Sequence, residues 1–208
     1  MARRFRALTL EHLDQLPAGC SGCVFWESSE MSERRCGARC DAEAQAAWYR
    51  RVTAEWGDCG RVAVEDDVIL GFVKYAPSGY FPQAQTFLAA PLDPNVPLIS
   101  CLHLAPEARN LGLGTVLLRA ALKDLTQRGE KKVESFALAQ RPETFQEAPM
   151  PGIEFLLRNG FTVARPDLLY PLLQLELRSL VTWAENLEAV LESLKLPVRA
   201  PERVPTPW

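Results

Sequence analysis

A short segment, ARNLGLGTVLLRAAL at residues 108–122, places an arginine and two glycines directly in front of a strongly amphipathic run. Glycine has no side chain, so another group can approach its backbone very closely. The first turn of a helix offers unpaired N–H groups and the positive end of the helix dipole, and both favour a bound anion. The segment therefore predicts a phosphate-binding turn between a strand and a helix.

Two common phosphate-binding motifs do not fit this segment. A P-loop requires a lysine followed by serine or threonine after its second glycine, whereas Thr115 follows Gly114 directly. A dinucleotide-binding fingerprint requires glycine or alanine three residues after Gly114, where this chain has Leu117. A plain strand-to-helix turn that binds no ligand is the structural alternative to any phosphate-binding motif.

A third pattern does fit. The arrangement R-x-x-G-x-G at residues 109–114 follows Pro106 and an apolar stretch that ends in LHL at residues 102–104. It resembles the acyl-CoA motif of the GNAT acetyltransferase superfamily, and FLLRNGF at residues 155–161 resembles a helix end in the same family. The resemblance implies a GNAT-like α/β fold, in which helices flank both faces of a mixed, mostly antiparallel central sheet.

The resemblance also implies acetyl-CoA as the cofactor and direct transfer of its acetyl group to an amine. The diphosphate would bind the backbone amides of the glycine turn, and the pantetheine arm would pair with the main chain of the preceding strand. The cofactor-binding residues implied are Leu102, Leu104, Arg109, Asn110, Leu111, Gly112, Leu113, Gly114 and Thr115.

Two residues are candidates for the catalytic base. An amine with a pKa of about 10 must lose a proton before it attacks a thioester. His103, one of two histidines, adjoins the expected pantetheine-pairing positions and titrates in a suitable range. Glu134 lies on the neighbouring expected strand, where the resemblance implies a carboxylate with this role. The structural alternatives are a hydrogen-bonded core histidine and a solvated glutamate.

The usual proton donor of the family is absent from its expected position. Family members often carry a tyrosine near the end of the second conserved helix, and that position falls at Leu156 here. A customary asparagine at the start of that helix falls near Pro149. A thiolate whose parent thiol has a pKa of about 8.5 can leave without an acid. Tyr170 is an alternative acid, or else a buried structural residue.

Four cysteines have spacings compatible with a tetrahedral zinc site. They are Cys20, Cys23, Cys36 and Cys40. The wider second pair and the nearby Cys59 favour ordinary buried thiols instead, so we assign no metal ligand. Directly after the first pair, Phe25, Trp26 and Glu27 could face an acceptor amine, with the packing of both rings in the core as the alternative.

Periodicity and turn signals predict the elements that position these residues. The expected strands are 5–10, 61–65, 68–76, 98–104, 131–138, 161–165 and 170–177. The expected helices are 11–16, 41–56, the run behind the glycine turn up to Gly129, a short one from Pro151 to Asn159, and one that starts at Thr182. Five prolines in residues 77–97 predict a long loop.

Composition narrows the class of protein. The 208 residues, 48% hydrophobic and 24% charged, are typical of a soluble globular domain. A net charge of -3 argues against non-specific binding of nucleic acid. No stretch approaches the roughly 18 apolar residues of a membrane span, and the N-terminus lacks the apolar core of a signal peptide. We therefore expect a cytoplasmic protein with no membrane partner.

We expect residues 1–180 to form the acetyltransferase domain, including a cysteine-containing insertion at about 20–40, and residues 181–208 to form a helix and a proline-rich tail. The acceptor is expected to be a small-molecule or peptide amine, and the chain a monomer or a homodimer. The sequence does not decide the acceptor's identity, the oligomeric state or whether the acyl group is longer than acetyl. The alternative function is a non-catalytic acyl-CoA-binding or sensing module, with or without zinc, that acts through a protein partner.

Overall fold

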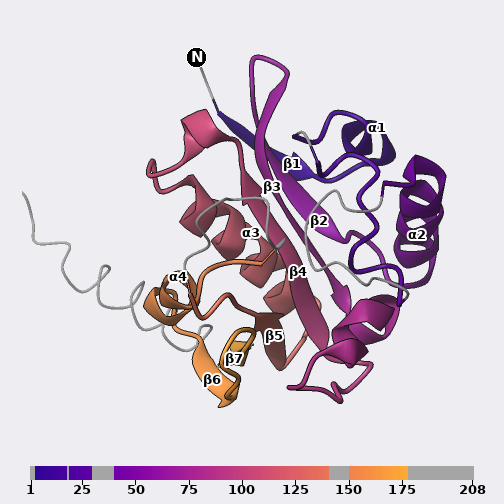
Figure 1. Cartoon of the computed structure of the whole chain (residues 1–208). Coiled ribbons are helices and arrows are strands. Elements are labelled where there is room, and N and C mark those ends of the chain that lie inside the picture. Colours follow the sequence, from indigo (N-terminus) through magenta and orange to yellow (C-terminus); the bar gives the residue numbers. More distant parts are fainter. Residues whose placement is uncertain (1–2, 18, 30–39, 141–149, 178–208) are drawn as a thin grey trace, which may run out of the picture.

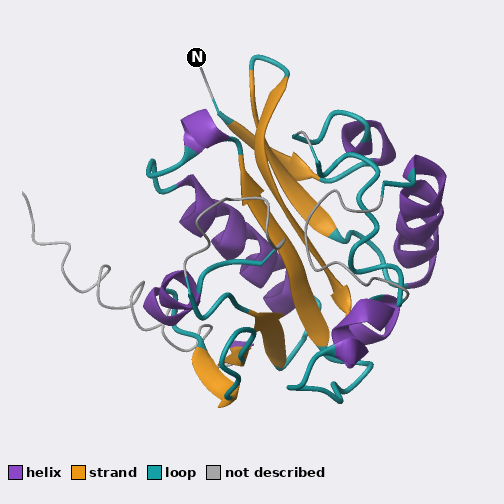
Figure 2. Ribbon diagram, viewed as in Figure 1, coloured by secondary structure: helices purple, strands orange, loops and turns teal. Residues whose placement is uncertain are grey.

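The computed structural model describes residues 3–17, 19–29, 40–140 and 150–177. Its centre is a seven-stranded sheet with the strand order β1-β2-β3-β4-β5-β7-β6. Among the described strands, β4 and β5 pair in parallel and the other neighbours pair antiparallel. Helices cover both faces of the sheet (Figures 1 and 2). The predicted mixed, mostly antiparallel α/β architecture is confirmed.

The bounds of the elements agree closely with the predicted order. The strands are β1 (Arg4–Ala7), β2 (Gly60–Glu65), β3 (Val68–Pro77), β4 (Pro97–Leu104), β5 (Lys132–Phe136), β6 (Thr162–Arg165) and β7 (Leu172–Glu176). The α-helices in the described part of the chain are α1 (Leu10–Leu13), α2 (Ala42–Glu55), α3 (Leu113–Gln127) and α4 (Ile153–Arg158). The helix expected from Thr182 lies outside the described residues.

The first strand is shorter than predicted, and the first helix starts earlier. Thr9 is the N-cap of α1, and its backbone N–H donates to His12 Nδ1 at 3.1 Å. This local capping contact stabilises a helical turn over residues that would otherwise extend β1. The strand therefore ends at Ala7, and α1 occupies a single turn.

The proline-rich connection between β3 and β4 is more ordered than the predicted long loop. It contains two 3-10 helices, η1 (Ser78–Tyr80) and η2 (Pro82–Thr86). Phe81 and Phe87 in this connection are buried in the hydrophobic core. Its aromatic residues supply apolar surface, so the connection is part of the folded core.

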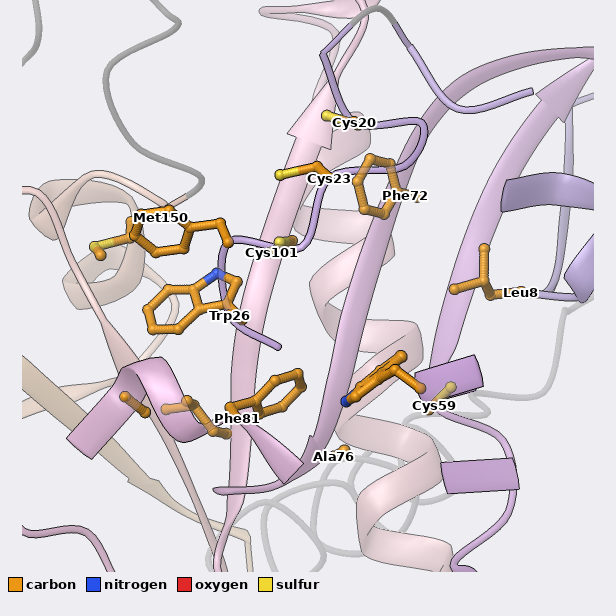
Figure 3. Packing of buried hydrophobic residues seen from close by; sticks show 14 of the residues in the cluster. Leu8, Cys20, Cys23, Trp26, Cys59, Phe72, Ala76, Phe81, Cys101 and Met150 are labelled. Atoms are coloured by element: carbon orange, nitrogen blue, oxygen red, sulfur yellow. The ribbon is translucent and has the colours of Figure 1, made fainter. Parts of the chain in front are cut away.

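Two hydrophobic cores lie on opposite faces of the sheet, which explains why the central strands are apolar on both sides. The first core packs α1 and α2 against the sheet and contains Trp48. It also contains Trp26 and Phe72, which are labelled in Figure 3. The second packs α3 and α4 against the other face and contains Leu117 and Leu156. The glycine turn therefore precedes a helix that is anchored along its length.

A polar cluster ties α3 to the sheet. The Arg61 guanidinium contacts Asp124 through two nitrogens, one of which donates to Oδ1 at 2.6 Å. The Tyr75 hydroxyl donates to the same carboxylate. Burial, together with this hydrogen bond to Asp124, raises the pKa of Tyr75, so its hydroxyl stays protonated and keeps donating. One carboxylate thus joins β2, β3 and α3.

Asp124→Ala is expected to lower the free energy of unfolding by about 3 kcal/mol, because two part-buried donors lose their acceptor. Urea-induced unfolding measures this loss. As a control, Glu65→Ala removes an exposed ion pair with Arg3 (Nε–Oε1 3.2 Å) and should cost less than about 1 kcal/mol. Equal losses in the two variants would contradict the structural role of Asp124.

Candidate active site

The glycine turn has the backbone conformation that its sequence requires. Gly112 is the N-cap of α3 with φ 75°, and Asn110 has φ 61°, both in the left-handed region that glycine and asparagine tolerate best. A Cβ atom added at Gly112 would meet no other atom within 4 Å. The turn is therefore open to solvent on the side where a ligand would approach.

The backbone amides of the turn divide into two groups. Arg109 N–H donates to the Pro106 carbonyl at 3.3 Å, and Thr115 N–H donates to the Gly112 carbonyl at 3.1 Å. Between them, the amides of residues 112–114 belong to the cap and first turn of α3, where N–H groups have no partner four residues earlier. We therefore narrow the proposed diphosphate contacts to these central amides, and give Arg109 and Thr115 a role in shaping the turn.

The Arg109 side chain supports the same conformation. Its Nε donates to the Leu104 carbonyl at 3.4 Å, at the end of β4. This contact holds the start of the turn against the strand that precedes it. The structure thus places Arg109, Asn110 and Leu111 in one short segment between β4 and α3, with Leu111 57% exposed.

The strands β4 and β5 separate at the place where the pantetheine arm was predicted to bind. Their paired residues are Leu98 and Glu134 alone. Leu102 and Leu104, beyond that pair, are half-buried, whereas the first five residues of β4 are buried. A Cβ at Gly114 would lie 3.5–3.6 Å from Leu102, Leu104 and Phe155. The edge of β4 therefore opens next to the glycine turn.

A β-bulge interrupts β4 between Leu98, which pairs with β5, and Leu102, where the edge is open. Lys74 pairs with Cys101 and Tyr75 pairs with Ile99, so Ser100 is an extra residue on β4. A bulge bends its strand and redirects the side chains that follow. After it, Cys101 faces the first core, while Leu102 and Leu104 face the second. No pattern in the sequence predicted this bulge.

His103 lies on β4 on the side that faces the first core. Its ring stacks on Phe72 with centroids 6.0 Å apart. Burial, and to a smaller extent the positive charge of Arg109, lowers the pKa of His103 to about 4. The imidazole is therefore neutral at physiological pH and can accept a proton. His103 packs in the structure, as the structural alternative expected, and its lowered pKa makes it a weaker proton acceptor than the ordinary histidine that the sequence suggested.

This depressed pKa has a measurable effect on stability. Between about pH 6.5 and pH 4 the unfolded chain protonates this histidine while the folded chain does not, so stability falls as pH falls. We expect the unaltered protein to lose about 2 kcal/mol more than His103→Asn between about pH 7 and pH 5. Urea unfolding at the two pH values tests this, and parallel losses would contradict it.

Glu134 is buried, contrary to the solvated alternative. Its Oε1 accepts a hydrogen bond from Lys132 Nζ at 3.0 Å, and its Oε2 has no hydrogen-bond partner among the described residues. Glu134 lies opposite Leu98, whereas His103 is five residues further along β4. At about 3.3 Å per residue, roughly 16 Å of strand separates the two positions. The structure therefore does not bring both candidates to one reacting atom.

The missing proton donor is replaced by core packing. Leu156 is completely buried in the second core, and Pro149 lies outside the described residues. Tyr170 packs edge-on against Phe87 with centroids 5.4 Å apart, which fits the structural alternative for this residue.

The cysteine-containing segment is held by ordinary hydrogen bonds. The Gln45 side chain accepts from Gly22 N–H at 2.9 Å and donates to the carbonyls of Cys20 and Cys23, both at 3.0 Å. Cys23 pairs with Cys40 in an isolated β-bridge. Within the described ranges, no three His, Cys, Asp or Glu side chains are grouped to hold a metal ion. The fourth cysteine of the predicted zinc set, Cys36, lies outside these ranges.

Sequence reasoning missed one buried ion pair. Lys74 Nζ contacts Glu27 Oε1, and the two side chains are only 6% and 4% exposed. A lysine within the otherwise apolar strand VILGFVKYA was the available signal, because a lysine is rarely buried without a charged partner. Glu27 itself was considered only as a residue that could face an acceptor.

Comparison with known proteins identifies the family. Residues 24–144, more than half of the chain, match the model of the acetyltransferase (GNAT) family. The chain belongs to the GNAT family. The family predicted from the glycine turn is therefore confirmed. Acetyl-CoA, the predicted cofactor, is the cofactor of this family. No curated protein sequence matches the chain.

Solved structures confirm the GNAT fold. The structure of yncA from Salmonella typhimurium with acetyl-CoA has a TM-score of 0.57 at 16% identity, covering 85% of this chain and 95% of that one. An N-acetyltransferase from Staphylococcus aureus Mu50 has a TM-score of 0.56 at 14% identity, with coverages of 85% and 99%. PaiA N-acetyltransferase from Thermoplasma acidophilum, in complex with coenzyme A, has a TM-score of 0.51 at 17% identity and the same coverages. At such low sequence identities, the structural similarity establishes the fold alone.

Proposed function

We propose that this GNAT-family chain transfers an acetyl group from acetyl-CoA to an amine. The observation that carries the proposal is the open, left-handed turn at the N-terminus of α3, directly beside the separated edge of β4. Unpaired first-turn amides and the helix dipole favour a diphosphate. The residues present therefore fit coenzyme A without a lysine or a metal ion in the turn.

The residues around the open edge of β4 would have different roles. The amides of residues 112–114 would hold the diphosphate, and the main chain at Leu102 and Leu104 would align the pantetheine arm. Bound acetyl-CoA supplies a thioester, whose carbonyl carbon forms a bond to the acceptor nitrogen while the C–S bond breaks and the thiolate leaves. Backbone N–H groups along β4 would polarise that carbonyl, and positioning would lower the remaining barrier.

The acceptor nitrogen must give up a proton, and His103 and Glu134 are the candidates to accept it, directly or through a water molecule. His103 is supported by its neutral imidazole at the outer end of the opening. Glu134 is supported by its buried, unpartnered carboxylate oxygen at the inner end. The proton would then pass to solvent or to the departing thiolate, which needs no tyrosine to leave.

The thiols near the opening favour direct transfer over an acyl-cysteine intermediate. Burial raises the pKa of Cys101 to about 12, although the positive charge of Lys74 opposes the shift. The thiolate is the nucleophilic form of cysteine, so this side chain is unreactive at neutral pH. The acetyl group would therefore pass from CoA to the amine in one step.

Two measurements test the proposal. A thermal-shift titration with acetyl-CoA should raise the melting temperature, because a ligand that binds only the folded state stabilises it. Release of CoA thiol with a panel of primary amines, including small polyamines and peptide N-termini, should show turnover. No thermal shift at saturating acetyl-CoA would overturn the proposal.

A sensing module is the second candidate, and the buried Leu156 at the position of the usual proton donor favours it. A sensor would give the thermal shift without thiol release. The class of acceptor, small-molecule or peptide amine, and a monomeric or homodimeric state are part of the proposal, as is a location in the cytoplasm. No helix in the described part of the chain is long and apolar enough to cross a membrane.

A further inference from the structure

Two cysteines that are distant in the sequence lie opposite each other at the start of α2. Cys23 and Cys40 pair in an isolated antiparallel β-bridge. Next to this pair, Asp41 N–H donates to the Gly22 carbonyl at 2.6 Å. Cys23 N–H donates instead to the Cys20 carbonyl, three residues earlier, at 3.1 Å. Cys23 and Cys40 are therefore a non-hydrogen-bonded pair of the bridge, the kind in which opposite side chains lie closer together.

The backbone geometry of this pair suits a disulfide bond. Opposite Cα atoms in a non-hydrogen-bonded antiparallel pair are about 4.5 Å apart. Disulfide bonds join residues whose Cα atoms are about 4.4–6.8 Å apart. Because the bridge already holds the two backbones at such a separation, a bond between the Sγ atoms of Cys23 and Cys40 would need little backbone movement.

Helix α2 fixes both sides of the bridge. The Gln45 side chain on α2 accepts from Gly22 N–H at 2.9 Å and donates to the Cys23 carbonyl at 3.0 Å. On the other side, Asp41 is the N-cap of α2, and its carboxylate accepts from Ala44 N–H at 2.9 Å. The two cysteines are thus held at the same end of one helix.

The cysteines differ in their access to solvent. Cys40 is exposed, whereas the other cysteines in the described part of the chain, Cys20, Cys23, Cys59 and Cys101, are buried. Burial raises the pKa of both Cys59 and Cys101 to about 12, so these two stay as thiols, which oxidants attack less readily than thiolates. An oxidant from solvent therefore reaches Cys40 first, and Cys23 is the thiol opposite it.

We propose that Cys40 is a site of oxidation by hydrogen peroxide, and that Cys23 resolves the oxidised form into a disulfide. The Cys40 sulfur attacks one peroxide oxygen, the O–O bond breaks, and the products are a sulfenic acid and water. The Cys23 sulfur then attacks the Cys40 sulfur. The S–S bond forms, the S–O bond breaks, and the hydroxyl group leaves with the Cys23 proton as a second water molecule. This site does not depend on the proposed acetyl transfer.

The disulfide would also change the stability of the protein. A bond from Cys23 to Cys40 closes a loop in the unfolded chain and lowers its conformational entropy. The melting temperature of the oxidised protein should therefore be at least about 4 °C higher than that of the same protein reduced with dithiothreitol. Thermal unfolding of both forms measures the difference.

Peptide mapping of the full chain tests the site directly. The protein is purified with a chelator, so that no metal ion covers the thiols, then treated with hydrogen peroxide, unfolded and alkylated. Trypsin without a reductant should release one cross-linked pair of peptides, residues 7–34 and 40–50, which mass spectrometry identifies. Dithiothreitol should separate the pair. The absence of this pair, or a bond from Cys40 to any other peptide, would overturn the proposal.

Three variants identify the partner of Cys40, because peptide 7–34 contains both Cys20 and Cys23. Cys23→Ser should abolish the cross-link. Cys20→Ser is the matched control, since Cys20 is also buried and its carbonyl also accepts from Gln45, and this variant should keep the cross-link. Cys40→Ser changes an exposed side chain, so it should fold normally and lose both the cross-link and the rise in melting temperature. A cross-link that requires Cys20 and not Cys23, or a rise that persists in Cys40→Ser, would overturn the assignment.

Discussion

Gly112→Leu is expected to lower the affinity for acetyl-CoA at least about 100-fold, a loss of roughly 3 kcal/mol in binding free energy. The left-handed N-cap of α3 leaves open space above Gly112, and in the proposed complex the diphosphate fills that space. A leucine side chain would hold the diphosphate away from the amides. Isothermal titration calorimetry with acetyl-CoA measures the effect.

The opposite end of α3 supplies a closely matched control. Gly129 also has a positive φ, 82°, and a Cβ there also meets no atom within 4 Å. Gly129→Leu therefore carries a similar backbone cost, about 1–2 kcal/mol, without touching the proposed cofactor site. Its affinity for acetyl-CoA should equal that of the unaltered protein. Equal losses at Gly112 and Gly129 would show that backbone strain, and not the diphosphate, explains the effect.

The second large effect concerns the proton acceptor. One of the variants His103→Asn and Glu134→Gln is expected to lose about 100-fold or more in kcat, which is the typical contribution of a general base. Only one should do so, because the two side chains are roughly 16 Å apart along the sheet and cannot serve the same nitrogen. Thiol release with the best amine acceptor, at saturating acetyl-CoA, measures kcat for each variant.

The pH dependence of kcat tests His103 separately. If His103 is the base, its own protonation should lower kcat only near pH 4, since its pKa is lowered to about 4 by burial and by Arg109. A decline at higher pH would report protonation of the acceptor amine. Affinity for acetyl-CoA should stay within about threefold in both variants and shows that each one folds. Similar kcat values in both variants and the unaltered protein would contradict a base at either position.

Much of the architecture follows from short-range signals. The paired aspartates at 66 and 67 both have a positive φ and close the hairpin of β2 and β3, as two-residue hairpin turns require. The 3.6-residue period after the glycine turn gives α3, because its apolar face is buried against the sheet. The same local reasoning predicted the left-handed turn that we propose as the cofactor site, since such a cap is a property of a few adjacent residues.

The features that the sequence did not predict depend on contacts between distant segments. The bulge at Ser100 is set by the pairing of β4 with β3, and the ion pair joins Glu27 to Lys74 across 47 positions. The buried state of Glu134 depends on how β5 packs between β4 and β7. Neither spacing nor composition encodes such partners, so these features appear only in the structure.

Amide NMR of the ¹⁵N-labelled protein tests the central claim most directly. Titration with coenzyme A should shift the resonances of Gly112, Leu113 and Gly114 strongly, because their N–H groups would donate to the diphosphate. Pantetheine, which lacks the diphosphate, should leave these three amides almost unchanged. Unaltered resonances at saturating coenzyme A, or equal shifts with pantetheine, would contradict the cofactor site and the acetyl transfer proposed from it.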